Sequence, residues 1–313
     1  MMYSVYKMNR IEGNCSFQNI DGFIFFATPE ERSLSVAKKM KRMDILPKQV
    51  VALTIENTPF CKDEKTFENT DVIKSSMEAN LYSSLILNLK DIHKYISSKK
   101  IIGIDISVMP TPVFAQILHF IIKRHAETRI IVYYTEPIYY SLENLFDYIT
   151  LDGEIEIKAI PGYEGKTSQD NEVQRVIFYM LGFETNGLNK LIPQVVNPDY
   201  IVPINGFPSY FPKYKDISII NNNANYHEID IKMAFSSANN PFEAYNKMSE
   251  LKNRYDQCCI DIIPAGSKPM ALGACLFALK GGDNDVRLLF PFPSEHISRQ
   301  SVGCGTVWEY IID

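Results

Sequence analysis

The sequence predicts an α/β protein made of two tandem Rossmann-like units, each with a mostly parallel sheet. Short apolar runs, rich in β-branched and aromatic residues, alternate with amphipathic stretches along most of the 313 residues. Continuous apolar strands separated by helices are typical of parallel sheets that are covered on both faces. This length is also sufficient for two domains of roughly 150 residues each.

The first half begins with the apolar run 22–27, which predicts a buried strand, and the amphipathic stretch 33–43 predicts the helix after it. Apolar residues at helical spacing predict a second helix over 71–98 and a third over 112–124, where a proline suits the first turn. β-Branched apolar runs predict the remaining strands at 49–55, 100–106 and 129–134.

The second half repeats this alternation. Asn240 and Pro241 predict the cap and first turn of a helix that runs to about residue 255. A polar, glycine-containing segment separates the halves, so we expect a first unit at 1–155, a linker at 156–171 and a second unit at 172–313. Further strands are expected at 175–181, 200–204, 257–263 and 286–290, further helices at 186–195 and 268–279, and a last strand at 306–312 that closes the second sheet.

The two halves also predict an internal duplication. Residues 104–112 and 260–269 both show a strand with an internal aspartate, a short polar loop, and a proline at the start of an apolar helix. Asp105 thus corresponds to Asp261, and the arginine and apolar strand that follow each helix also correspond. We expect the two units to be related by an approximate two-fold axis.

Composition excludes several functions. The 32 Lys+Arg against 37 Asp+Glu, with a pI near 5.7, argue against a dedicated duplex-DNA surface but leave a local basic site open. The six cysteines form no CxxC pair, so we expect reduced thiols, including vicinal Cys258 and Cys259, and no metal site or cofactor. No apolar leader or membrane span is expected, which predicts a cytoplasmic protein.

The loop 264–269 is the best candidate for ligand chemistry. Gly266 allows the backbone to approach a ligand closely, Ser267 can cap or bind, and Lys268 adds charge at a positive helix end. These residues suit a nucleotide phosphate or another anion; the alternative is a plain strand-to-helix turn with a surface lysine. The corresponding first-half loop, 107–112, contains neither glycine nor lysine.

Other loops at strand ends supply secondary candidates. Glu31 and Arg32 can contact a ligand or cap a helix, Tyr134 and Glu136 can stack on a base or pack in the core, and Glu184 follows the first strand of the second half. Segment 162–167 ends like a P-loop, but Ile160 stands where the first glycine is required. No catalytic signature is present, so an acid or base remains open among Glu31, Asp105, Glu184 and Asp261.

Residues 260–279, with the Ala-Gly-Ser-Lys-Pro-Met run before an apolar helix, resemble the corresponding loop of CARF domains, the Rossmann-like sensors of cyclic oligonucleotides. Two such units in one chain resemble the SAVED arrangement, in which a pseudo-dimer binds a nucleotide messenger. Weaker similarity is found at 25–33, and the lysine-free loop of the first half departs from the pattern.

The resemblance implies a nucleotide-binding or regulatory subunit of a prokaryotic anti-phage or CRISPR-linked signalling system, with its effector on a separate protein chain. The alternatives are an enzyme that acts on a nucleotide or phosphorylated small molecule through the same loop, and a non-catalytic scaffold. Fold analogy does not choose among them.

Overall fold

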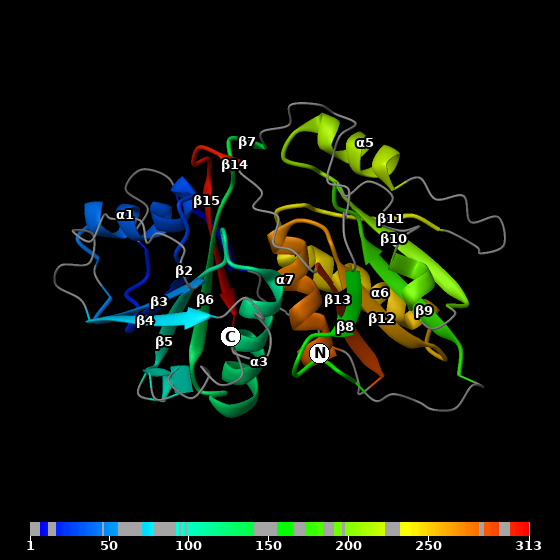
Figure 1. Ribbon diagram of the computed structural model, residues 1–313, viewed down its shortest axis with the longest axis horizontal. Coiled ribbons are helices and arrows are strands. Elements are labelled where there is room, and N and C mark those ends of the chain that lie inside the picture. The colour runs from blue at the N-terminus through cyan, green and yellow to red at the C-terminus, as the bar shows by residue number, and fades with distance from the viewer. Residues whose placement is uncertain are drawn as a thin grey trace. The chain divides into compact units, whose positions relative to one another are not determined.

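The structure is a computed structural model of the whole chain, and it describes residues 7–11, 17–45, 47–55, 71–77, 92–93, 95–97, 99–140, 155–165, 173–183, 191–195, 198–222, 232–281, 285–293 and 301–312 (Figure 1). The chain divides into two compact units. The first unit is formed by Val5–Ser141 with Arg299–Asp313, and the second unit by Leu142–Ser298 with Met1–Ser4.

The first unit contains a seven-stranded sheet in the order β1-β15-β6-β5-β2-β3-β4. The strands from β4 to β6 pair in parallel, whereas β15 is antiparallel to β6 and β1 is antiparallel to β15. A two-stranded ribbon joins β7 (Tyr139–Tyr140) to β14 (Ser301–Val302). The main elements are β1 (Lys7–Ile11), β2 (Gly22–Phe26), the 3-10 turn η1 (Glu31–Leu34), α1 (Ser35–Arg42), β3 (Gln49–Ile55), β4 (Asp71–Met77), β5 (Ile101–Asp105), α3 (Thr111–Arg124), β6 (Arg129–Thr135) and β15 (Val307–Ile312).

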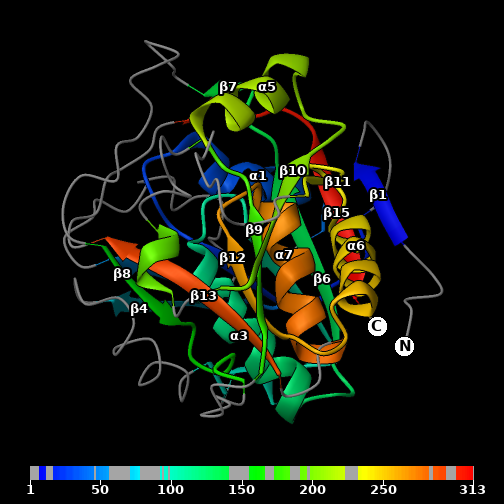
Figure 2. The ribbon, with the colours of Figure 1, turned by 90° about the vertical axis from the view of Figure 1, so that its right-hand side faces the viewer.

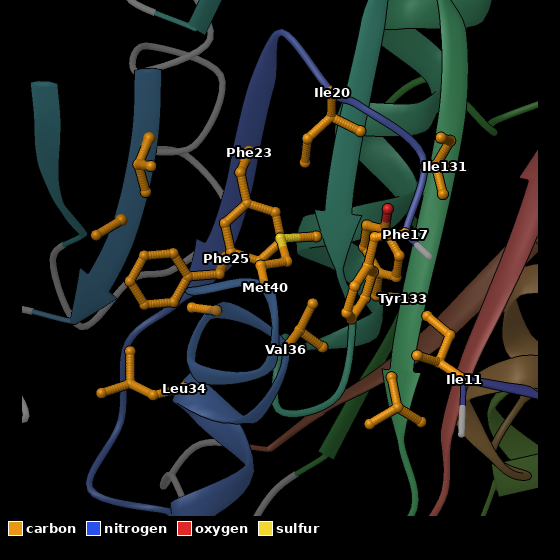
Figure 3. Packing of buried hydrophobic residues seen from close by; sticks show 14 of the residues in the cluster. Ile11, Phe17, Ile20, Phe23, Phe25, Leu34, Val36, Met40, Ile131 and Tyr133 are labelled. Carbon is orange, nitrogen blue, oxygen red and sulfur yellow. The ribbon is translucent and has the colours of Figure 1, made fainter. Parts of the chain in front are cut away.

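The core of the first unit is aromatic on the face that α1 covers. Phe23 and Phe25 project from β2 toward Val36 and Met40 of α1, and Tyr133 of β6 lies beside them (Figure 3). The intervening residue Ile24 is also fully buried, although strand geometry directs it to the opposite face. Burial on both faces explains why β2 is a continuous apolar run.

The second unit contains a six-stranded sheet in the order β11-β10-β9-β12-β13-β8. Its strands pair in parallel except for β8, which is antiparallel to β13. Helices α6 and α7 pack against each other, and α5 contacts β10 (Figure 2). The elements are β8 (Ile155–Ala159), β9 (Arg175–Met180), the turn η3 (Ile192–Gln194), β10 (Tyr200–Gly206), α5 (Pro212–Asn221), β11 (Ala234–Ser236), α6 (Pro241–Arg254), β12 (Cys259–Pro264), α7 (Lys268–Leu276), the π-helical turn η4 (Phe277–Gly281) and β13 (Val286–Pro293).

The two sheets share one strand order. In each, five parallel strands lie in the order third, second, first, fourth and fifth along the chain, and an antiparallel strand follows the fifth. Asp105 and Asp261 therefore occupy corresponding strands, β5 and β12. They do not occupy the same position along these strands, because Asp105 is the last residue of β5 and Asp261 is the third residue of β12.

The expected assignment of the outer strands is wrong at two places. Segment 306–312 does not close the second sheet: β15 pairs with β6 of the first. Residues 155–159, expected at the end of the first unit and in the linker, form β8 and pair with β13, and Ile160 is fully buried. Both strands pair with partners distant in sequence, and local patterns of polarity carry no information about that choice.

The helix expected over 71–98 is also wrong at its start. Residues 71–77 form β4, which pairs with β3 along its whole length. β4 is an edge strand of this sheet. Residues 78–91 lie outside the described residues. Within the described part of the chain, no helix is both long and apolar enough to span a membrane.

Candidate functional site

The loop between β12 and α7 lies at the carboxyl edge of the second sheet. Ser267 is the N-cap of α7: its Oγ accepts a hydrogen bond from the Met270 amide at 3.3 Å and donates one to the Ala238 carbonyl. Lys268 follows as the first residue of the helix and is half-buried. Of the two roles open to Ser267 from the sequence, the structure therefore shows capping.

Gly266 holds this loop against the end of β9. A Cβ atom at this position would lie 3.3 Å from Met180 Cβ, 3.3 Å from Met270 Sδ and 3.4 Å from the Leu181 carbonyl oxygen. These distances are tighter than ordinary side-chain contacts, so the absence of a side chain brings the backbone of the loop close to its neighbours. The close approach of Gly266 in the structure is to these protein neighbours, and its expected approach to a ligand stays a prediction.

Two further loops meet this one at the same edge. The Ala238 amide donates to the Pro208 carbonyl at 3.0 Å, and the Tyr210 hydroxyl donates to the Ala238 carbonyl at 2.9 Å. Asn240 caps α6 by accepting from the amides of Phe242 and Glu243. The loops after β10, β11 and β12 are thus joined by hydrogen bonds, and the N-termini of two helices lie at this edge.

Asp261 lies away from that edge, near the amino ends of the strands. Its buried carboxylate accepts two hydrogen bonds from Arg287, both at 2.6 Å, and two from Arg175 Nη1 at 3.0 and 3.1 Å. The hydrogen bond to Asp261 is the main cause that raises the pKa of Arg287. A carboxylate with four such bonds links three strands and is not placed for acid–base chemistry on a ligand at the carboxyl edge.

The first unit has a buried polar cluster at the carboxyl ends of β2, β5 and β6. Arg32, which follows β2, donates from Nε to Glu30 at 2.6 Å and to Ser301 at 2.7 Å, and from Nη1 to the Thr135 carbonyl at 3.1 Å. Ser301 also donates to Glu30. These bonds fix Arg32 inside the unit and attach the segment before β15 to the turn after β2.

Asp105 is the buried carboxylate of this cluster. Its Oδ1 accepts from the Ser107 amide at 2.9 Å and from the Ser107 hydroxyl, which in turn accepts from the Thr135 amide at 2.8 Å. Its Oδ2 is buried without a hydrogen-bond partner. Burial raises the pKa of Asp105 to about 7, against which the bonds from Ser107 and the charge of Arg32 act.

The other predicted site residues are dispersed. Glu31 is exposed on η1, whereas Tyr134 is only 1% exposed, so its ring packs inside the first unit and presents no face to a ligand. Glu136 accepts a hydrogen bond from Trp308 Nε1 at 2.6 Å, and burial raises its pKa. Glu184 lies outside the described residues.

The P-loop-like segment does not offer its first amide to an anion. The Gly162 amide donates to both carboxylate oxygens of Glu164, at 3.0 Å each. Lys166 and Thr167 lie outside the described residues.

Several residues of these sites carry no local sequence signal. Glu30 and Ser301 meet around Arg32 although 271 positions separate them, so no local signal links them. Phe207 was not among the predicted site residues, and it is 56% exposed beside the joined loops of the second unit. Its place shortly after the strand predicted at 200–204 is a local signal, whereas its exposure cannot be read from the sequence.

The described residues contain no group of three or more His, Cys, Asp or Glu side chains arranged to hold a metal ion. The described cysteines, Cys258, Cys259, Cys275 and Cys304, are free thiols. Comparison of the chain with protein-family models gave no match, and a search of curated proteins gave none either, so the fold and the geometry of the two strand-end sites are the basis for assigning a function.

Proposed function

We propose that the chain is a nucleotide-binding regulatory subunit whose loop 264–269 takes the anionic part of its ligand. The observation that carries the proposal is the position of Lys268, the first residue of α7, directly after Gly266 and the Ser267 cap at the carboxyl edge of a parallel sheet. The helix N-terminus and the lysine both favour negative charge there. In open α/β sheets, ligands bind at this edge.

The shared strand order of the two sheets supports the further proposal of an internal duplication. The two loops differ in their chemistry. In the first loop, Ser107 is hydrogen-bonded to both Asp105 and Thr135, and α3 has no side-chain cap. The second loop instead combines Gly266 with Lys268. A diverged pair of this kind would concentrate anion binding in the second unit.

The regulatory role and the setting in prokaryotic anti-phage or CRISPR-linked signalling rest on the resemblance of residues 260–279 to CARF domains. In this proposal the response to the nucleotide is passed to a separate effector chain. The loop 264–269 then binds the nucleotide, the polar cluster around Arg32 maintains the fold of the first unit, and neither needs a catalytic group.

One observation favours a second candidate, an enzyme acting on a nucleotide or phosphorylated small molecule. Asp105 holds a buried carboxyl oxygen without a partner, its pKa is raised to about 7 by burial, and the charge of Arg32 acts on it. A carboxyl group with a pKa near neutrality can accept or donate a proton at physiological pH.

A thermal-shift screen of mono-, di- and cyclic nucleotides, followed by chromatography of the bound compound, tests both candidates. We expect at least one nucleotide to raise the melting temperature and to be recovered unchanged. Recovery of a converted product, lost in Asp105→Asn, would favour the enzyme. No stabilisation by any nucleotide at millimolar concentration would contradict the regulatory subunit and also an enzyme that acts on a nucleotide.

A further inference from the structure

Two exposed aromatic rings lie beside the joined loops of the second unit. Phe207, directly after β10, is 56% exposed, and Phe235 of β11 is 43% exposed. Their ring centroids are 6.2 Å apart with the planes at 74°. Large exposed rings of this kind commonly mark a binding surface, because water is a poor environment for them.

Positive charge accompanies the rings. Lys215 of α5 places Nζ 5.7 Å from the centroid of Phe207, and it also pairs with Asp216 at 3.2 Å. On the other side of β11, Phe235 lines a cleft of about 460 Å³ together with Lys232, Lys247 and Arg254. Among the described residues that line the cleft, Glu250 is the one carboxylate, and it pairs with Lys247 at 2.5 Å and with Arg254.

The two features form one surface across the edge strand β11. Phe235 belongs to both, and β11 lies between α5, which carries Lys215, and α6, which carries Lys247 and Arg254 (Figure 1). We call Phe207, Phe235, Lys215 and the cleft the β11 surface. Among the described residues of this surface, the cations Lys215, Lys232, Lys247 and Arg254 outnumber the carboxylates Asp216 and Glu250, although the whole chain has a net charge of −5.

We propose that the β11 surface binds short single-stranded nucleic acid. The aromatic rings stack on unpaired bases, and the cations of α5 and α6 follow the phosphates. Exposed aromatics interleaved with cations are the combination that such ligands require, whereas an acidic peptide would use the cations and leave the rings without flat partners. The surface does not include Lys268, so the inference goes beyond the nucleotide site proposed above.

The test is fluorescence anisotropy of 5′-fluorescein-labelled hexauridylate with the full chain, over a range of salt concentrations. Stacking predicts that Phe207→Leu/Phe235→Leu weakens binding at least about tenfold, and that Phe207→Tyr retains it. Lys247→Gln/Arg254→Gln should make the slope of log affinity against log salt shallower by about 1.4, the effect of two lost phosphate contacts on a single strand. Asp216→Asn should tighten binding.

Matched controls separate this surface from the rest of the chain. Lys123→Gln/Arg124→Gln removes the same two charges from α3 of the first unit and should leave the slope unchanged. Lys268→Ala should bind hexauridylate like the wild type, which makes failure of the nucleotide site distinguishable from failure of the β11 surface. Melting temperatures verify that each variant is folded; the single Phe207→Leu replaces the double variant if that one is not.

Three results would overturn the proposal. The first is no binding of hexauridylate by the wild type at 50 mM salt, about the low end of the range in which phosphate contacts are strong. The second is an affinity and a salt slope that are the same in the aromatic and cationic variants as in the wild type. The third is competition by hexaglutamate as effective as that by unlabelled hexauridylate, which would assign the surface to acidic peptides.

Discussion

The guanidinium of Arg287 donates two hydrogen bonds to the buried carboxylate of Asp261, from Nε and from Nη2, each at 2.6 Å. The two residues are register partners on β13 and β12, and Arg175 at the start of β9 binds the same carboxylate. This ion cluster joins three neighbouring strands at the amino ends of the second sheet. Asp261 therefore has a structural role at the opposite end of the strands from Lys268.

Removing Asp261 should destabilise the second unit strongly. In Asp261→Ala the two arginines, whose side chains are only 12% and 16% exposed, lose their shared counter-charge. We expect the free energy of unfolding to fall by about 3–5 kcal/mol, as measured by urea denaturation. Glu250→Gln, which breaks surface ion pairs on α6, should change it by less than about 1 kcal/mol. Equal effects of the two changes would contradict the role assigned to Asp261.

Gly273 in α7 should resist replacement by alanine. Alanine normally favours a helix by about 1 kcal/mol over glycine. Here a Cβ atom would lie 2.7 Å from Ala244 Cβ and would also collide with the Pro241 carbonyl of α6. We expect Gly273→Ala to lower the melting temperature, with a cost of about 1–3 kcal/mol from overpacking. A more stable variant would mean that α6 and α7 are not packed this closely.

Ser267 should stabilise α7 through its hydroxyl. Ser267→Ala removes the acceptor for the Met270 amide and the donor to Ala238, with an expected loss of about 1 kcal/mol. Ser267→Thr keeps both functions and should recover most of the stability. Urea denaturation of the two variants gives the comparison, and an alanine variant as stable as wild type would exclude the cap.

The raised pKa of Asp105 predicts a pH dependence of stability. The ordinary value of 3.8 applies to the unfolded chain, whereas in the folded state burial raises the pKa to about 7. The stabilisation is complete below pH 4 and is lost as the pH rises toward 7, because the unfolded state releases this proton more readily. The contribution falls by up to about 1.4 kcal/mol per pH unit in this window.

Urea denaturation of the wild type and of Asp105→Asn at several values between pH 4.5 and 7.5 measures this contribution. The difference in stability, wild type minus variant, should decrease as the pH rises. A difference that stays constant across the window would show that Asp105 ionises near its ordinary pKa.

Much of the fold can be predicted from the sequence because its signals are local. The five-residue run of β2 is apolar at every position. Asn240 and Pro241 predict the cap and first residue of α6, and in the structure Asn240 accepts a hydrogen bond from the amide of Phe242, two positions further along. The sheet to which an outer strand belongs is not encoded locally. β15 lies at the end of the chain but pairs with β6. Glu309 of β15 and Tyr133 of β6 are neighbours only because of this non-local pairing.

The candidate sites were predictable to a different extent. Gly266, Ser267 and Lys268 could be found because strand, glycine, cap and helix follow one another within a few residues. Burial could not be read in the same way: Tyr134 and Arg32 occupy strand-end positions typical of ligand contacts, yet both are enclosed by residues from distant segments. Polarity alone does not distinguish a buried polar cluster from an open site.

The most direct test of the proposed function is isothermal titration calorimetry of the best nucleotide from the thermal-shift screen with wild type, Lys268→Ala and Lys280→Ala. Lys280 is an exposed lysine in η4, after α7, so its loss controls for net charge. A charge-assisted contact of about 1.5–3 kcal/mol predicts that Lys268→Ala raises the dissociation constant about ten- to a hundredfold, and that Lys280→Ala leaves it unchanged. Wild-type affinity in Lys268→Ala, with the fold intact, would contradict the assignment of the ligand to this loop.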